Sequence, residues 1–225
     1  MERRTFQLID LDRTLFDTSR FAKAITDEIN LSEPGTGTKL DAMYEKAYKN
    51  EETFFMLRYL RQEHGDAWFE ALVERAVAKI GAATLLLTGV KERLALADSV
   101  TSYRPSWGIL TYGDDIDQRM KTRLVGLDDA PILLTSTPDK AKLIQSWQNS
   151  DGTFQLPSEF GGGIVDALTF EDDKLRAFAG LPKGVTGFWV TQDAHAVERL
   201  VELHNTEGSV MPVKNLFEVA NKLRQ

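Results

Sequence analysis

The order of the elements that the sequence predicts strongly limits the folds open to this chain. An apolar run at 6–9 predicts one buried strand, and 18–88 then shows apolar residues at helical spacing with almost no strand signal. From 89 onward, predicted strands and helices alternate. Strands are expected at 107–111, 131–135, 164–170, 187–191 and 209–211, and helices at 115–124, 140–148, 194–203 and 216–223. Such alternation is typical of an α/β fold with a mostly parallel sheet and helices on both faces.

We therefore predict two domains in the 225 residues. Segments 1–17 and 89–225 are expected to form a Rossmann-like, doubly wound α/β core. Segment 18–88, with about four helices, is expected to be an all-helical cap inserted after the first strand. A chain of this length can bury a large core and still carry a smaller inserted domain.

The composition narrows the classes of partner. With 27 Lys and Arg against 34 Asp and Glu, the net charge of −7 argues against a nucleic-acid-binding surface. It does not exclude a small anionic substrate, because one metal ion and one lysine can reverse the local field. There is no cysteine, which excludes disulfides and thiolate catalysis. No apolar run approaches the ~20 residues that span a bilayer, and the residues before the first predicted strand lack the longer apolar region of a signal peptide, so we expect neither feature. We expect a cytoplasmic protein without membrane or nucleic-acid partners.

Two carboxylates follow the first predicted strand directly. Asp10 and Asp12 are separated by one residue, at the point where the chain leaves the sheet. Carboxylate oxygens suit hard divalent cations, and Mg²⁺ is often held by one or two carboxylates together with substrate phosphate and water. An Asp-x-Asp after a strand is also common as a polar turn. These residues alone leave both interpretations open.

Later strands end in residues that favour the site interpretation. Thr111 is followed by a flexible turn into a helix, an arrangement that can aim a hydroxyl and backbone N–H groups at an anion. Lys140 lies at a helix start after the next strand, and Asp172 and Asp173 follow the strand at 164–170. In parallel sheets, ligands bind at the carboxyl ends of the strands, so these side chains are expected on one rim.

This ordered set resembles the four motifs of the haloacid dehalogenase superfamily of phosphohydrolases, and the resemblance covers nearly the whole chain. The opening motif, Asp-x-Asp-x-Thr, is matched by Asp10-Leu11-Asp12-Arg13-Thr14. The other motifs are matched by Ile109-Leu110-Thr111-Tyr112-Gly113, by Lys140 in Asp139-Lys140-Ala141-Lys142, and by Phe170-Glu171-Asp172-Asp173. One departure is Arg13, where many relatives carry Gly. The helical insert lies where the family's first-type cap domain usually lies.

The resemblance implies a chemical role for each carboxylate. Asp10 would be the nucleophile that forms an aspartyl-phosphate, and Asp12 would protonate the leaving group and then activate water. Mg²⁺ would be held by Asp10 and Asp173, by the backbone carbonyl of Asp12, and with support from Asp172. Which of Asp172 and Asp173 is the direct ligand stays open.

The resemblance also implies a phosphate-binding set. Thr111 and the backbone N–H of Tyr112 or Gly113 would bind phosphate oxygens. Lys140 would add positive charge to the transferring group. Lys142, two residues further on, is the alternative for that lysine.

We expect a Mg²⁺-dependent phosphohydrolase acting on a small phosphorylated metabolite. The alternatives are phosphomutase-type transfer with the same core residues and a non-catalytic binding protein on the same fold. A dehalogenase is disfavoured because its reaction does not use the second Asp or the metal. The substrate and the oligomeric state lie beyond the sequence. Asp17 and Asp114 are expected to be helix caps or turn residues rather than ligands, and basic cap residues such as Arg58 and Arg61 to form mostly a solvated face.

Overall fold

In the computed structural model, residues 4–50, 54–97, 99 and 103–224 are described. The chain divides into two compact units: Met1–Phe16, Leu87–Tyr112 and Asp129–Gln225 in one, Asp17–Leu86 and Gly113–Asp128 in the other. The first contains the α/β sheet and the second is helical. The domain boundaries at 1–17, 18–88 and 89–225 stay a prediction, and their residues 1–3, 51–53, 98, 100–102 and 225 lie outside the described part.

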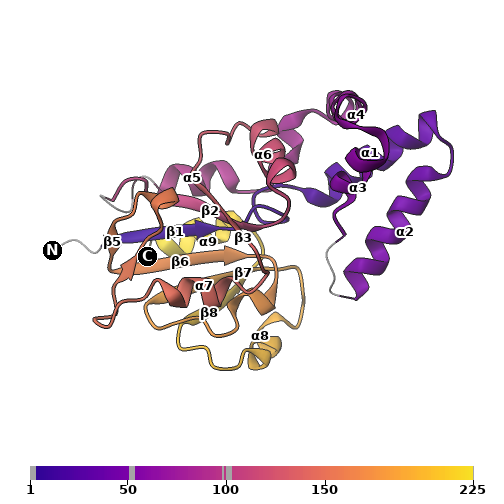
Figure 1. Cartoon of the computed structure of the whole chain (residues 1–225). Helices are drawn as coiled ribbons and strands as arrows, with labels where there is room; N and C mark the ends of the chain where they lie inside the picture. Colours follow the sequence, from indigo (N-terminus) through magenta and orange to yellow (C-terminus); the bar gives the residue numbers. More distant parts are fainter. Residues whose placement is uncertain (1–3, 51–53, 98, 100–102, 225) are drawn as a thin grey trace. The chain divides into compact units, whose positions relative to one another are not determined.

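The α/β unit is built on a six-stranded sheet in which all neighbouring strands are parallel (Figure 1). The order is β3-β2-β1-β6-β7-β8. The strands are β1 (Thr5–Ile9), β2 (Trp107–Tyr112), β3 (Ile132–Thr135), β6 (Ala167–Asp172), β7 (Val185–Val190) and β8 (Ser209–Val213). The sheet therefore grows in both directions from β1, which confirms the predicted doubly wound, Rossmann-like fold and puts the topological switch point beside β1.

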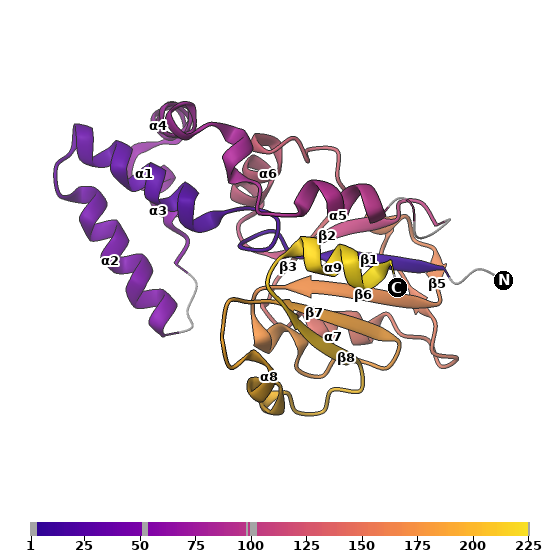
Figure 2. The same ribbon diagram turned by 180° about the vertical axis from the view of Figure 1, so that it is seen from behind.

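Helices cover both faces of this sheet. Viewed from behind, α5 (Val90–Ala97) and α9 (Leu216–Leu223) lie over one face (Figure 2). The other face is covered by α7 (Lys140–Ser146) and by the 3₁₀ helix η3 (Leu175–Phe178), which packs in the same buried cluster. Between β7 and β8, the short α8 (Ala196–Arg199) is followed by the 3₁₀ turn η4 (Leu200–Glu202).

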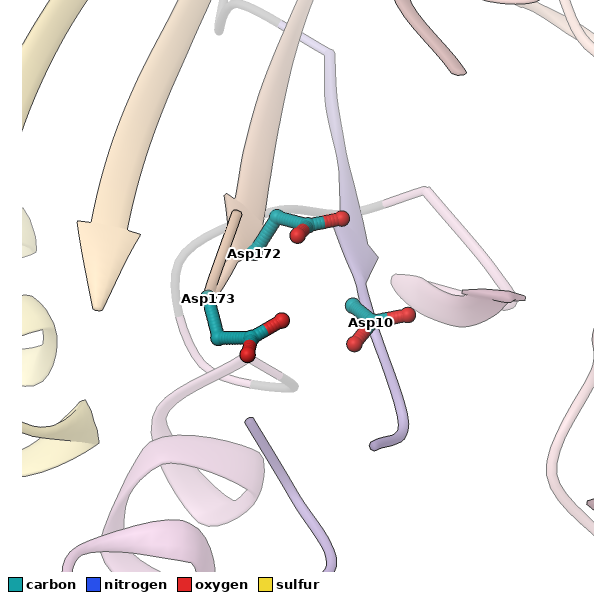
Figure 3. Close-up of side chains that lie close together, drawn as sticks. All are labelled: Asp10, Asp172 and Asp173. Atoms are coloured by element: carbon teal, nitrogen blue, oxygen red, sulfur yellow. The ribbon is translucent and has the colours of Figure 1, made fainter. Parts of the chain in front are cut away.

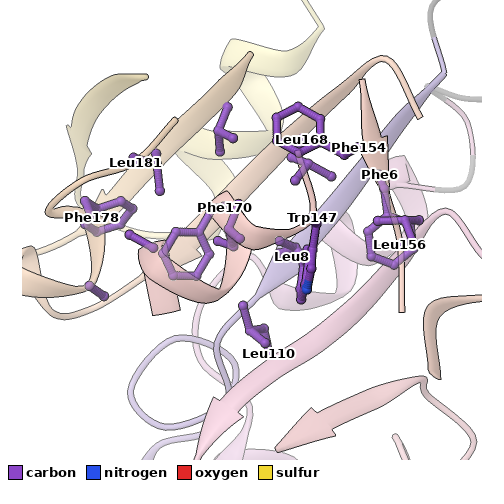
Figure 4. Close-up of a cluster of buried hydrophobic side chains, with 14 of the residues drawn as sticks. Phe6, Leu8, Leu110, Trp147, Phe154, Leu156, Leu168, Phe170, Phe178 and Leu181 are labelled. Atoms are coloured by element: carbon purple, nitrogen blue, oxygen red, sulfur yellow. The ribbon is translucent and has the colours of Figure 1, made fainter. Parts of the chain in front are cut away.

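The core on the α7 face is apolar. Alternate residues of β1 and β6, among them Leu8 and Phe170, point into a buried cluster together with Ile144 of α7 and Trp147 (Figure 4). Part of this cluster comes from a short antiparallel pair, β4 (Phe154–Gln155) and β5 (Ile164–Val165), joined through the 3₁₀ turn η2 (Ser158–Phe160). Packing of this layer fixes α7 against the sheet, and with it the position of Lys140.

The strand predicted at 164–170 is two strands. Asp166 separates β5 from β6, because its backbone N–H donates to the carbonyl of Arg4 at 2.8 Å and its carboxylate accepts from the Arg4 N–H at 2.8 Å. The second strand, β6, runs to Asp172, two residues beyond the predicted end. This extension carries the acidic residues to the rim of the sheet.

The helical unit holds the four helices predicted after β1. They are α1 (Thr18–Ser32), α2 (Thr36–Lys49), α3 (Met56–His64) and α4 (Asp66–Ile80), followed by the 3₁₀ turn η1 (Ala82–Leu85). The unit also includes α6 (Asp115–Leu124). Asp17 caps α1 and Asp114 caps α6 as predicted, each accepting a backbone N–H three residues ahead. Among the described residues, no helix combines the length and the apolar character needed to cross a membrane.

The prediction of a solvated face is wrong for Arg61. Its side chain is 10% exposed, and it donates to Asp114 and to Asp117 at 2.7 Å each. Arg58, which is 45% exposed, also pairs with Asp114, at 2.7 Å. The reason is that α6 presents acidic residues toward α3 within the helical unit, and this tertiary partner cannot be read from the spacing of α3 alone.

Candidate active site

Three carboxylates converge where β1 and β6 end (Figure 3). Asp10 directly follows β1, Asp172 is the last residue of β6, and Asp173 comes next. One oxygen from each lies within 4.8 Å of the others. The backbone N–H of Asp10 donates to the carbonyl of Glu171 at 2.8 Å, which ties the two strand ends together. Three acidic residues predicted to hold a metal are thus brought together at one rim.

Lys140 is the cation of this cluster. It is the first residue of α7, is 5% exposed, donates to Asp172 at 2.6 Å and also contacts Asp10. Lys142 is 77% exposed and pairs instead with Asp139 at 3.3 Å. Of the two candidate lysines, the structure brings Lys140 to the carboxylates.

The electrostatics of the cluster favour a bound cation. Burial raises the pKa of Asp10 to about 7, with Asp172 and Asp12 adding to the effect and Lys140 opposing it. Burial raises the pKa of Asp173 to about 8, again with help from Asp172 and Asp10. Burial would lower the pKa of Lys140, but the charges of Asp10 and Asp172 raise it above its ordinary value. With all of these groups ionised, three carboxylates and one ammonium sum to a charge of −2, which one divalent cation would offset.

The two aspartates at the end of β6, its last residue Asp172 and the following Asp173, have different surroundings. Both oxygens of Asp172 are occupied, one by Lys140 at 2.6 Å and the other by the backbone N–H of Lys174 at 2.8 Å. The Asp173 carboxylate accepts no hydrogen bond from the described residues, although its backbone carbonyl accepts the indole N–H of Trp189 at 3.0 Å. Asp173 is therefore the better candidate for direct metal ligation, with Asp172 orienting the lysine.

The chain turns sharply after Asp12, which is itself half-buried. Arg13 has φ 63°, in the left-handed region that glycine occupies without steric cost. The turn is closed by the Arg13 N–H, which donates to the Phe16 carbonyl at 2.8 Å, and by the Phe16 N–H, which donates to the Leu11 carbonyl at 2.8 Å. This backbone geometry accounts for the frequent Gly that the resemblance places at position 13.

The predicted phosphate-binding segment lies at the end of β2. Thr111 is fully buried within the strand, which continues through Tyr112, one residue beyond the predicted end. The Thr111 carbonyl accepts the hydroxyl of Thr135 at 3.3 Å, which fixes this end of β2 to β3. Gly113 follows at once, and a Cβ there would lie 2.2 Å from Nε2 of Gln118, so a larger residue at the turn into α6 would require the Gln118 side chain to move. The phosphate-binding roles of Thr111, Tyr112 and Gly113 stay predictions.

The donor set fits Mg²⁺. Asp10, Asp172 and Asp173 offer only carboxylate oxygens, the ligand type that hard divalent cations prefer, and burial together with the neighbouring carboxylates raises the pKa of Asp10 and of Asp173, so a bound cation would stabilise their ionised forms. Within the described part of the chain, this is the one group of three or more acidic, histidine or cysteine residues close enough to share an ion.

Sequence reasoning missed one feature beneath this site. Glu171 and Arg93 form a fully buried ion pair, with Nε of Arg93 2.9 Å from Oε1 of Glu171. The available signal was a charged residue inside an apolar strand, directly before two aspartates. Arg93, the partner of Glu171 on α5, lies 78 residues away in sequence, so the pairing could not be predicted from local sequence.

Comparison with known proteins supports the fold. No protein-family model matches the chain, and no curated protein matches it significantly. Among solved structures, a haloacid dehalogenase-like hydrolase from Burkholderia xenovorans LB400 is 15% identical with a TM-score of 0.63, over 97% of this chain and 98% of that one. The HAD-hydrolase YfnB from Bacillus subtilis, bound to magnesium, is 16% identical with a TM-score of 0.55, over 100% of both chains.

A further similar structure is described as a beta-phosphoglucomutase, from Thermotoga maritima. It is 14% identical with a TM-score of 0.54, over 98% of both chains. The chain therefore has the fold of the haloacid dehalogenase-like hydrolases. Because structures with this fold carry the names of a hydrolase and of a mutase, the choice of reaction must come from the site.

Proposed function

We propose that this protein is a Mg²⁺-dependent phosphohydrolase that cleaves a small phosphorylated metabolite through an aspartyl-phosphate intermediate. The observation that carries the proposal is the convergence of Asp10, Asp172 and Asp173 around Lys140 at the rim of the sheet. The helical unit is proposed to act as the substrate-selecting cap. The magnesium in the solved structure of YfnB supports the choice of metal.

Asp10 is proposed as the nucleophile. One of its oxygens forms a bond to phosphorus while the bond from phosphorus to the leaving-group oxygen breaks, which leaves phosphate on Asp10. The Asp10 N–H bond to the Glu171 carbonyl holds the backbone of the nucleophile in place. Lys140 contributes positive charge beside Asp10, where negative charge gathers as the phosphoryl group transfers.

Asp12 is proposed to move the protons. It donates one to the departing oxygen, and as a carboxylate it then takes one from the water that attacks the phospho-aspartate. Hydrolysis of that intermediate releases inorganic phosphate and returns Asp10 to its starting state. Thr111 and the N–H groups of Tyr112 and Gly113 are proposed to bind the non-bridging phosphate oxygens.

Asp10 and Asp173 would hold Mg²⁺, with the Asp12 carbonyl as a further ligand and Asp172 supporting through Lys140. The bound ion would offset the repulsion between the Asp10 carboxylate and an anionic phosphate. The chain's own residues contribute the positioning, because Lys140 and the strand ends fix two of the three carboxylates by hydrogen bonds.

The site favours hydrolysis over binding alone. Burying Asp10 and Asp173 beside Asp172 disfavours their ionised forms and raises the pKa of each, a cost that a recognition surface for an anionic phosphate has no reason to carry. A dehalogenase has no use for Asp12 or for the metal. A phosphomutase shares every core residue and is distinguished by its need for a bisphosphate primer.

The test is hydrolysis of 4-nitrophenyl phosphate with Mg²⁺, with and without a chelator. We expect activity that is lost on chelation and restored by Mg²⁺, and that is abolished in Asp10→Asn while the far-ultraviolet circular dichroism is unchanged. A matched control, Asp17→Asn, alters a helix cap and keeps its turnover. Activity that survives Asp10→Asn or ignores the chelator contradicts the proposal. Turnover of a sugar phosphate only in the presence of a bisphosphate favours the mutase.

A further inference from the structure

The last two residues of β6 are held from opposite faces of the sheet. Neighbouring residues in a strand point to opposite sides. Asp172 points to the α7 face, where it accepts from Lys140 at 2.6 Å. Glu171 points to the α5 face, where it accepts from Nε of Arg93 at 2.9 Å and also contacts Nη2. Each helix layer thus provides one buried cation to this strand end.

Glu171 is also the backbone link between the two strands of the site. Its carbonyl accepts the N–H of Asp10 at 2.8 Å, and its own peptide leads directly into Asp172 and Asp173. A shift of Glu171 therefore moves the backbone of all three carboxylates. Because Arg93 of α5 is ion-paired with the side chain of Glu171, a change in the position of α5 would also move Glu171 and the carboxylates next to it.

Stability does not explain why this ion pair is buried. Both side chains are 0% exposed, and removing two charges from water costs more than a well-packed apolar pair would. The pair is also incompletely satisfied, because Nη1 of Arg93 and Oε2 of Glu171 make no hydrogen bond to the described residues. Gln7 and Thr169, paired across β1 and β6, likewise have a buried oxygen without a partner there. A buried, costly pair of this kind is best explained by the geometry that it imposes.

We infer that Arg93 and Glu171 are positioning residues that set the Mg²⁺ affinity of the site by fixing the end of β6 against β1. The inference rests on the proposed function, since it assigns the pair to the proposed metal site. Arg93 touches neither the metal site nor substrate in this scheme; it acts through Glu171. The pair would act like the outer-shell residues that hydrogen-bond to metal ligands and orient them. Loss of such residues commonly weakens metal binding 10- to 100-fold.

The experiment replaces both charges with apolar groups of similar length, in Arg93→Met/Glu171→Met. Removing both partners avoids an unpaired buried charge, so we expect the metal-free thermal unfolding temperature to equal or exceed that of the unaltered protein. We expect the dissociation constant for Mg²⁺, measured by isothermal titration calorimetry at pH 8, to rise by about 10-fold or more. The matched control is Lys23→Ala/Asp27→Ala, which removes an exposed ion pair of α1 and leaves Mg²⁺ binding unchanged.

A second variant keeps the inference testable if the double replacement does not fold. Arg93→Lys retains the charge but loses the two-nitrogen contact with Oε1, and we expect Mg²⁺ to bind about 3- to 10-fold more weakly to a folded protein. A dissociation constant within twofold of the unaltered value, in either folded variant, overturns the positioning role and leaves the proposed function standing. Absence of Mg²⁺ binding in the unaltered protein overturns both, so the two failures are distinct.

Discussion

Lys140 joins Asp172 and Asp10 across the end of the sheet: its ammonium lies 2.6 Å from Oδ2 of Asp172 and also contacts Oδ1 of Asp10. Both acids and the lysine are nearly excluded from solvent. A buried ion pair loses much of its Coulomb attraction to desolvation, whereas removal of one partner leaves an unpaired buried charge. Lys140 is thus expected to matter both to the fold and to the reaction.

Replacing Lys140 should lower both the stability of the fold and the rate of the proposed reaction. For Lys140→Met we expect the free energy of unfolding to fall by about 3 kcal/mol, because the carboxylates lose their buried counter-charge. We expect turnover of 4-nitrophenyl phosphate to fall by about 10²- to 10³-fold, since positive charge at the transferring group is lost. Urea unfolding and steady-state kinetics measure the two effects.

The neighbouring lysine provides the control for that pair of measurements. Lys142 is 77% exposed, so Lys142→Met should change stability by no more than about 0.5 kcal/mol and leave turnover intact. If the two variants behave alike, Lys140 has no special role in the site.

The raised pKa values of two acids predict an unusual dependence of stability on pH. Asp10 and Asp173 have ordinary values of 3.8 and folded values of about 7 and about 8. From about pH 4 to pH 8 the folded state therefore binds more protons than the unfolded state, so the free energy of unfolding falls as pH rises. In the presence of chelator, we expect the unfolding temperature to drop between pH 5.5 and pH 8.

Mg²⁺ should reverse this loss, because it replaces the protons on the same carboxylates. At 100 times the dissociation constant it should stabilise the protein by about 2.7 kcal/mol at pH 8, and by less at pH 6. Asp173→Asn should raise the metal-free stability at pH 8 by at least about 1.4 kcal/mol, the equivalent of one pKa unit, and should abolish the effect of Mg²⁺. If the metal-free stability stays flat or rises between pH 5.5 and pH 8, the result counts against a shared cation site. Equal metal-free stability of Asp173→Asn and the unaltered protein at pH 8 counts against it as well.

The sequence was sufficient for elements whose ends carry local signals. The helices predicted at 115–124 and 216–223 are found with those bounds, and both begin after a residue whose side chain accepts a backbone N–H, Asp114 and Asn215. The location of Asp10, Lys140 and Asp172 at one rim of the sheet could also be predicted from the sequence, because parallel strands place their carboxyl ends on one edge.

Features set by distant contacts could not be predicted in the same way. The break between β5 and β6 depends on Asp166 binding Arg4, 162 residues away. The burial of Arg61 depends on α6, and that of Arg93 on a strand 78 residues further on. The predicted helix 194–203 is shorter and tightens into a 3₁₀ turn after Arg199, where the side chain is held by Asp193 and Glu202.

The ion pairs between α3 and α6 should be unequal in strength. Burial raises the pKa of Asp117, and Arg61 opposes that rise, so Arg61→Met leaves a buried acid without its counter-charge. We expect a loss of about 3 kcal/mol for Arg61→Met, against no more than about 1 kcal/mol for the more exposed Arg58→Met. Urea unfolding measures the loss in the free energy of unfolding for each variant. Faster hydrogen exchange in α3 and α6 would show that the destabilised region lies in these two helices. Equal losses in the two variants would contradict this ranking.

The proposed proton transfers by Asp12 predict that the effect of Asp12→Asn depends on the leaving group. With an alkyl phosphate, whose alkoxide needs a proton to depart, we expect turnover to fall by about 10²- to 10⁴-fold. With 4-nitrophenyl phosphate the first step needs little help, but the second still lacks its base, so the phospho-aspartate should accumulate. Stopped-flow absorbance should then show a burst of nitrophenolate equal to the enzyme concentration, followed by slow turnover.

The same assay separates the two carboxylates of the opening motif. Asp10→Asn should give neither burst nor turnover with either substrate, because no bond to phosphorus can form at position 10. A burst in Asp12→Asn together with its absence in Asp10→Asn assigns attack to one residue and proton transfer to the other. Equal losses for both leaving groups without a burst would instead mean that Asp12 carries no proton, and that its carbonyl or its place in the turn before Arg13 is what the reaction requires.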